Sequence, residues 1–338
     1  MRRLSVLSGL FFCLLFSGNV LAQDDAIVRR AAFDIGSAAI KCSIADVDIT
    51  TGNIIKTVER LSQKVDFAED LSRSYDGNFS IEIMNKGIEV IEEMKRVAVD
   101  LKAVEFSGAG GNAFRTARNG RAYFVRIKEE TGIPCRIISE QQAALLSYHA
   151  VRQGIDASTD LLVWDIGGST MQMTARNLEG GLTFYIDSMA SIPFKSVVIG
   201  VIQKKDINTV TSPNPISEDE VRHALDYVQA YAEMNIPRPL VARIRGSKMR
   251  VAGIGGVHYY AIPEMLGGRN KSYTYDELEK ALLNWTGKPD EAFNSEYAHS
   301  RLTNLILTLG YMKTLGLKEI FPFKINEADG LLAAPEFW

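Results

Sequence analysis

Hydrophobic residues recur along the chain in two patterns, one typical of helices and one typical of strands. Between residues 81 and 94, apolar side chains recur every three or four positions behind Ser80, which predicts a helix over 80–99. Similar spacing predicts helices within 112–130 and over 140–151, 217–235 and 300–315. Short apolar runs predict strands at 104–108, 134–139 and 249–254. Strands interleaved with helices indicate an α/β architecture.

Two stretches share one design, in which an apolar run, a tight corner and a second apolar run follow one another. Residues 30–47 turn at Asp34-Ile35-Gly36-Ser37, and residues 160–176 turn at Asp165-Ile166-Gly167-Gly168-Ser169. Each stretch predicts a β-hairpin. Because the design occurs twice, we expect one fold used twice, with domains over 23–154 and 155–338.

These corners also suggest chemistry. A glycine after a strand-ending aspartate lets the chain turn and lets an anion approach the backbone N–H groups. The carboxylate beside such a cradle typically holds Mg²⁺. One Asp-Ile-Gly is equally well explained as a simple turn, but two of them and the pair Gly255-Gly256 favour a phosphate site between two lobes.

The N-terminus has the pattern of an export signal. Arg2 and Arg3 precede an apolar run over 4–16, and Val20-Leu21-Ala22 precedes Gln23 as signal-peptidase sites require. We expect residues 1–22 to be cleaved and the mature protein to be periplasmic or secreted, without stable membrane insertion. An uncleaved anchor is the alternative, although the run is shorter than the ~20 residues of a membrane-spanning helix.

Composition changes this picture little. The 338 residues are 46% hydrophobic and 23% charged, as in folded proteins, and carry a formal net charge of −3. Without a basic excess we expect no nucleic-acid partner and no polybasic membrane surface.

Cys42 and Cys135 remain after cleavage. Both lie in apolar runs, so two buried thiols are favoured over a disulfide. The sequence leaves a homodimer open.

Five segments in order then resemble the exopolyphosphatase / guanosine pentaphosphate phosphohydrolase (Ppx/GppA) family over nearly the whole mature chain. The segments are residues 33–37, 113–119, 137–139, 165–168 and 251–256, and residues 327–332 resemble a worn form of the end of short family members. The resemblance implies two ribonuclease-H-like domains of the actin, sugar-kinase and heat-shock-chaperone ATPase superfamily, with an interdomain cleft. It also implies a phosphoanhydride hydrolase that acts on polyphosphate or a related phosphate-rich anion with Mg²⁺.

The resemblance carries roles to particular positions. It implies that Asp34 and Asp165 face the metal and that a second set of residues binds phosphate, namely Gly36, Ser37, Arg115, Gly167, Gly168 and Ser169. An arginine at position 115 would make a bidentate, permanently charged contact to phosphate. Taken alone, Arg115 would be read as an ordinary surface residue of a helix.

The sequence departs from the family where catalysis is expected. The glutamate that activates water in the family falls on Ala143, or on Gln142 with a one-residue gap, and neither side chain can take a proton from water. Gln172 replaces a metal-side carboxylate. Glu140 is the remaining carboxylate near that helix start, where capping the first turn is favoured over reaching the cleft as a base.

Two functions therefore remain open. The first is an exported Ppx/GppA-like phosphoanhydride hydrolase with weak or no turnover. The second is a non-catalytic relative, a pseudoenzyme, that keeps the fold and binds phosphate or polyphosphate or acts as an interaction protein. An ATP-driven kinase or chaperone of the same superfamily is disfavoured, because ATP is scarce outside the cytoplasm.

Overall fold

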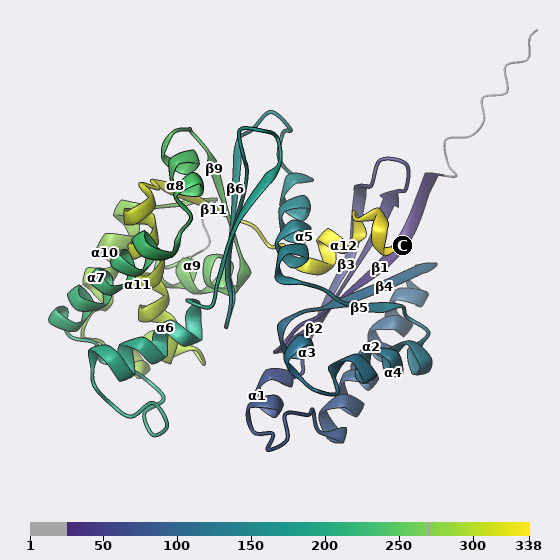
Figure 1. The fold of residues 1–338 in the computed structure, drawn as a ribbon, viewed down its shortest axis with the longest axis horizontal. Coiled ribbons are helices and arrows are strands. Elements are labelled where there is room, and N and C mark those ends of the chain that lie inside the picture. Colours follow the sequence, from purple (N-terminus) through teal and green to yellow (C-terminus); the bar gives the residue numbers. More distant parts are fainter. Residues whose placement is uncertain (1–25, 269–270) are drawn as a thin grey trace, which may run out of the picture.

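The computed structural model describes residues 26–268 and 271–338, which form two lobes (Figure 1). The first lobe is built on a five-stranded sheet of order β3-β2-β1-β4-β5. Its strands are β1 (Ile27–Ile35), β2 (Ala39–Asp48), β3 (Asn53–Lys64), β4 (Glu105–Gly110) and β5 (Cys135–Ile137).

The second lobe is built on a six-stranded sheet of order β10-β11-β9-β6-β7-β8. Its strands are β6 (Leu161–Ile166), β7 (Met171–Arg176), β8 (Leu182–Asp187), β9 (Arg250–Ile254), β10 (Tyr273–Thr274) and β11 (Glu319–Pro322).

The two sheets share one topology. In the first, β2 pairs antiparallel with both β1 and β3. On the other side of β1, β4 pairs in parallel with β1, and β5 pairs in parallel with β4. In the second, β6, β7, β8, β9 and β11 repeat this arrangement strand for strand. The expectation of one fold used twice, in two α/β lobes, is confirmed.

Helices of the first lobe lie on both faces of its sheet (Figure 1). They are α1 (Phe67–Ser72), α2 (Ile81–Asp100), α3 (Asn112–Thr116), α4 (Gly120–Thr131) and α5 (Glu140–Arg152). Ser80 caps α2 as expected, because its side chain accepts a hydrogen bond from the N–H of Ile83. The region 112–130 differs from a simple amphipathic helix, because it breaks into α3 and α4.

The break has a steric and a hydrogen-bonding basis. The backbone at Gly120 passes so close to α3 that a Cβ there would lie 2.1 Å from the carbonyl oxygen of Phe114. Within the break, Arg118 donates its backbone N–H to the carbonyl of Gly77 at 2.9 Å. Only glycine allows this close approach, so the chain turns sharply between α3 and α4.

Helices of the second lobe surround its sheet and a central helix, α11. They are α6 (Ser191–Val197), α7 (Glu218–Asn235), α8 (Arg238–Arg245), α9 (Ile262–Met265), α10 (Tyr275–Trp285) and α11 (Ala298–Leu315), with single π-helical turns at Val198–Ile202 and Val257–Ala261 and a 3₁₀ turn at Asp290–Phe293. Most of α11 is buried, because α6, α7 and α10 pack around it. Ser217 and Glu220 form a capping box at the expected start of α7.

The end of the chain crosses back to the first lobe. The last helix, α12 (Glu327–Leu332), packs on β1, β2, β4 and α5, and a 3₁₀ turn at Pro335–Phe337 follows it (Figure 1, yellow). A Cβ at Gly330 would lie 2.3 Å from the carbonyl oxygen of Leu146, so the backbones of α12 and α5 are in direct contact. Residues from 327 onward therefore belong spatially with the first sheet, although they fall in the expected domain 155–338.

Cys42 and Cys135 lie in one row of the first sheet, as free thiols. The row runs from Cys42 through Phe33 and Gly108 to Cys135 on four neighbouring strands. Three strand spacings separate the two cysteines by about 14 Å, which is too far for a disulfide. Burial raises the pKa of both thiols to about 12.

The expected signal peptide 1–22 and the cleavage site before Gln23 lie outside the described residues. Among the helices that the structure describes, none has the length and apolarity required to cross a membrane.

Candidate functional site

The two Asp-Gly corners occupy equivalent places in the two lobes. Asp34 lies near the end of β1, and Gly36 closes the turn to β2 by donating its N–H to the carbonyl of Ala39 at 2.9 Å. Asp165 lies near the end of β6, and Gly167 donates to the carbonyl of Thr170, also at 2.9 Å. The hairpins place both carboxylates at the carboxyl ends of central strands, where ligands commonly bind in α/β proteins.

The residue opposite each aspartate differs between the lobes. Lys41 is the cross-strand partner of Asp34, and its ammonium nitrogen lies 3.1 Å from Asp34 Oδ2. Gln172 is the cross-strand partner of Asp165; it is buried, and its Oε1 has no hydrogen-bond partner within the described chain. One corner therefore holds an ion pair, and the other holds a carboxylate beside an amide.

The two corners face each other closely enough for their charges to interact. Burial raises the pKa of Asp165 to about 6, Lys41 opposes that shift, and Asp34 adds to it. The pKa of Lys41 is raised, chiefly by Asp34 and further by Glu327 and Asp165. The fold thus brings together the two aspartates that the sequence pairs by pattern alone.

The backbone at Gly255 packs directly against the carboxylate of Asp165. It follows β9 with a positive φ of 83°, and a Cβ there would lie 2.3 Å from Asp165 Oδ1. Gly255, the first residue of the Gly255-Gly256 pair, therefore packs against the carboxylate of Asp165, and a side chain at this position would displace it.

Glu327 is a site residue that the sequence analysis did not single out. It begins α12, whose start is capped by Asn326 and Asp329, and its carboxyl group is buried although part of the residue is exposed. Burial raises its pKa, Asp34 and Asp165 raise it further, and Lys41 and Arg115 lower it. A buried carboxyl group among charged partners in an interlobe site is a functional candidate.

Arg115 lies at the first-lobe side of this group. It is near the end of α3, and its guanidinium donates to the carbonyl of Ile138 and binds Glu140 Oε1 at 3.1 Å. Because Arg115 also lowers the pKa of Glu327, its charge reaches the interlobe site. The positive charge of Arg115 therefore acts on the acidic group at the start of α12.

The start of α5 offers no free carboxylate. Ser139 and Gln142 form the capping box, and Gln142 Oε1 accepts the N–H of Ser139 at 2.9 Å. Glu140 binds Arg115 instead of capping the helix with its side chain. Ala143 is 5% exposed and packs in the core between α5 and α12. Neither position that aligns with the family glutamate presents a base to the site.

The remaining loop residues form two braced turns. The carbonyl of Ser37 accepts the N–H of Ala68 at 2.8 Å, and the carbonyl of Gly168 accepts the N–H of Ile192 at 2.9 Å. Gly168 and Ser169 are exposed, and in the described part of the chain no acceptor faces their backbone N–H groups. These N–H groups are of the kind that binds an anion.

The donor set does not fit a divalent cation as it stands. Within residues 26–268 and 271–338, no three His, Cys, Asp or Glu side chains are grouped so that they could hold a metal ion. The ammonium of Lys41 is ion-paired with the carboxylate of Asp34. Opposite Asp165, Gln172 supplies a neutral amide, which binds a divalent cation less strongly than a carboxylate would.

Comparisons with known proteins agree with this architecture. A model of the Ppx/GppA phosphatase family matches residues 44–289. Two structures of the Ppx/GppA phosphatase of Aquifex aeolicus superpose with TM-scores of 0.71 and 0.73, at 17% and 16% identity, over 91% of this chain and 99% of theirs.

An exopolyphosphatase from Cytophaga hutchinsonii superposes with a TM-score of 0.66 at 16% identity, over 90% of this chain and 96% of the other. At these identities the superpositions show the fold, and the family model shows the relationship. The chain belongs to the Ppx/GppA phosphatase family.

Proposed function

We propose that this protein binds the terminal phosphate of polyphosphate, or of a related phosphate-rich anion, between its two lobes and hydrolyses it very slowly or not at all. Membership of the Ppx/GppA family supports a function of the phosphoanhydride-hydrolase type. Two cations, Lys41 and Arg115, and the N–H groups of the β6–β7 turn supply the attraction for the anion.

The start of α5 carries the proposal of weak turnover. Water attack on a phosphoanhydride needs a group that orients and deprotonates the water, which contributes a factor of ~10²–10⁴ in rate. Ala143 is buried, Gln142 is held in the capping box, and Glu140 is bound to Arg115. Binding can therefore persist where turnover is lost.

Calorimetric titration with tripolyphosphate tests the binding part. Arg115→Ala should weaken binding roughly ten- to a hundredfold, because a lost charged hydrogen bond typically costs ~1.5–3 kcal/mol. The matched control is Arg222→Ala, which removes an exposed arginine that is also ion-paired, but on α7 of the second lobe. If the affinity for tripolyphosphate changed neither in Arg115→Ala nor with ionic strength, the anion would bind elsewhere.

A second candidate function, residual hydrolysis, is favoured by Glu327. Its carboxyl group shares the interlobe site with Asp34 and Asp165, so it is placed to act as a base in the absence of one on α5. Phosphate release from polyphosphate should be measured for the unmodified protein, Glu327→Gln and Glu140→Gln. Phosphate release no faster than in the absence of protein supports the binding function. Fast release by the unmodified protein would overturn the binding function. If Glu327→Gln abolished this release and Glu140→Gln did not, the base would be Glu327.

We further propose that the protein acts outside the cytoplasm, on the strength of the N-terminal signal pattern. Mass spectrometry of the mature protein should find Gln23 at its start. An intact Met1 in a cytoplasmic pool would contradict export.

A further inference from the structure

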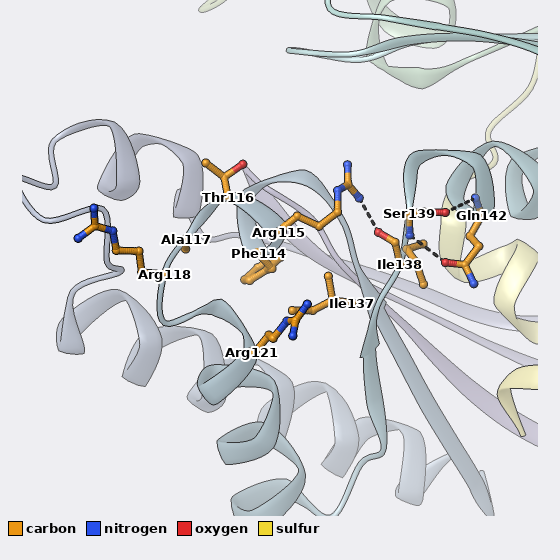
Figure 2. A pocket seen from close by; sticks show the side chains of 10 residues that line it. All are labelled: Phe114, Arg115, Thr116, Ala117, Arg118, Arg121, Ile137, Ile138, Ser139 and Gln142. Carbon is orange, nitrogen blue, oxygen red and sulfur yellow. Dashed lines mark hydrogen bonds between the residues drawn. The ribbon is translucent and has the colours of Figure 1, made fainter.

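A separate cavity of about 780 Å³ opens beside Arg115, entirely within the first lobe (Figure 2). It lies between the α3–α4 corner, the end of β5 and the start of α5, and this volume is within the range of small-molecule pockets. Its polar lining comes from three arginines, Arg115, Arg118 and Arg121, together with Thr116, Ser139 and Gln142.

Two of the three arginines have no charged partner. Arg115 binds Glu140, whereas no carboxylate within the described residues pairs with Arg118 or Arg121. Among the described residues that line the cavity none is acidic, so these two guanidinium groups give its lining a net positive charge, which attracts anions.

The α3–α4 corner produces this grouping. Gly120 permits the close turn, and the hydrogen bond from Arg118 to Gly77 fixes its outer end. Figure 2 shows Arg115 directed toward Ile138, Arg121 below it and Arg118 at the far end of the corner. The three arginines thus line one cavity, with Arg115 on the side of α5 and Arg118 on the opposite side.

The lining favours a phosphate chain over a nucleotide. Phe114 is the aromatic residue of the cavity, and it is 1% exposed, so its ring offers no face on which a base could stack. Guanidinium groups bind phosphate oxygens through charge-assisted hydrogen bonds, and several in one cavity suit several phosphates.

We propose that this cavity binds the phosphate groups that follow the terminal one, so that Arg118 and Arg121 select long linear polyphosphate over short anions. The proposal rests on the proposed function, because Arg115 connects the interlobe site to the cavity. The ligand class is a linear polyanion, and the specificity resides in chain length.

The experiment compares affinities for tripolyphosphate and for long-chain polyphosphate at the same ionic strength. Arg118→Ala/Arg121→Ala should weaken long-chain binding at least tenfold, reduce its dependence on salt, and leave tripolyphosphate binding within about twofold. Lys128→Ala is the matched control, since it removes an exposed charge from the same helix, α4, outside the cavity. Arg118→Lys/Arg121→Lys should retain most of the salt dependence.

Three outcomes would overturn this inference. Unchanged long-chain binding in Arg118→Ala/Arg121→Ala would remove the cavity from the binding path while leaving the proposed function intact. An equal loss for both anions, with an unchanged melting temperature, would assign the two arginines to the terminal-phosphate site. If Lys128→Ala lost as much affinity for long-chain polyphosphate, the effect would come from the net charge of the protein and not from the cavity. Failure of the proposed function is distinguishable, because Arg115→Ala would then leave both affinities unchanged.

Discussion

The ammonium nitrogen of Lys41 lies 3.1 Å from Asp34 Oδ2, across the first hairpin, and the carboxyl groups of Asp165 and Glu327 are near enough to raise its pKa further. A half-buried cation therefore interacts with three acidic side chains that come from both lobes and from the end of the chain. This relationship sets the charge of the interlobe site.

Replacement of Lys41 should weaken anion binding. Lys41→Met removes the cation nearest to Asp34, so tripolyphosphate should bind at least about tenfold more weakly. Titration calorimetry measures the affinity. Lys64→Met, at an exposed ion pair with Asp66, is the control. An unchanged tripolyphosphate affinity in Lys41→Met would show that the ammonium takes no part in anion binding.

Gly255 and Gly256 give a paired test of the second corner. Gly255→Ala forces a side chain into a positive-φ position and against Asp165 Oδ1, so it should destabilise the fold by ~1–3 kcal/mol and weaken anion binding. A Cβ at Gly256 meets no atom within 4 Å, so Gly256→Ala should leave stability and affinity nearly unchanged. Urea unfolding and calorimetry check both variants. Equal effects of the two changes would show that contact with Asp165 is unimportant.

The raised pKa of Glu327 predicts a pH-dependent effect of Glu327→Gln. At about pH 6 the carboxyl group is largely protonated and uncharged, so glutamine resembles it and anion affinity should change little. At about pH 9 the carboxylate is ionised and repels an anion, so its removal should strengthen binding. Titrations at both pH values measure the difference. The same gain at both would mean that Glu327 is ionised throughout this range.

His258 should make folding stability sensitive to acid. Burial lowers its pKa to about 3, while Nδ1 hydrogen-bonds the hydroxyl of Tyr273 and Nε2 is buried without a partner in the described chain. The unfolded state therefore binds an extra proton between about pH 6.5 and pH 3, and stability falls through that window as pH falls, by up to ~1.4 kcal/mol per unit.

The slope of the unfolding free energy against pH checks this prediction. It should become shallower in His258→Gln, even if that variant is less stable overall. His223→Gln, at an exposed position on α7, should keep the original slope. An unchanged slope in His258→Gln would place the acid sensitivity elsewhere, for example at His149 and the half-buried His299, whose pKa values desolvation also lowers.

Local patterns predicted local structure well. The 3–4 residue periodicity behind Ser80 and the acidic turn after Ser217 correspond to α2 and α7, because a cap and an apolar stripe act within a few turns of the helix. The two Asp-Gly corners also form equivalent turns, since strand, glycine and strand suffice to make a hairpin.

Contacts between distant segments were less predictable. Ala143 and Gln142 align with a catalytic position, but only packing shows that one is buried beneath α12 and the other is held by Ser139. Residues 112–130 were expected to contain one helix, and the close approach of Gly120 to Phe114 divides it. The sequence pattern of one segment does not show which distant segment packs against it in the folded protein.

The sequence by itself determined the two hairpins, the helix starts and the resemblance to the Ppx/GppA family, because these depend on neighbours within about 20 residues or on motif order. The tertiary structure alone decided that Lys41 and Glu327 join Asp34 and Asp165, and that Arg118 and Arg121 share a cavity. Glu327 is about 290 residues from Asp34 in the chain, and they meet only because α12 returns to the first sheet. Charges at such separations act on one another only after the chain has folded, because the Coulomb interaction depends on distance in space.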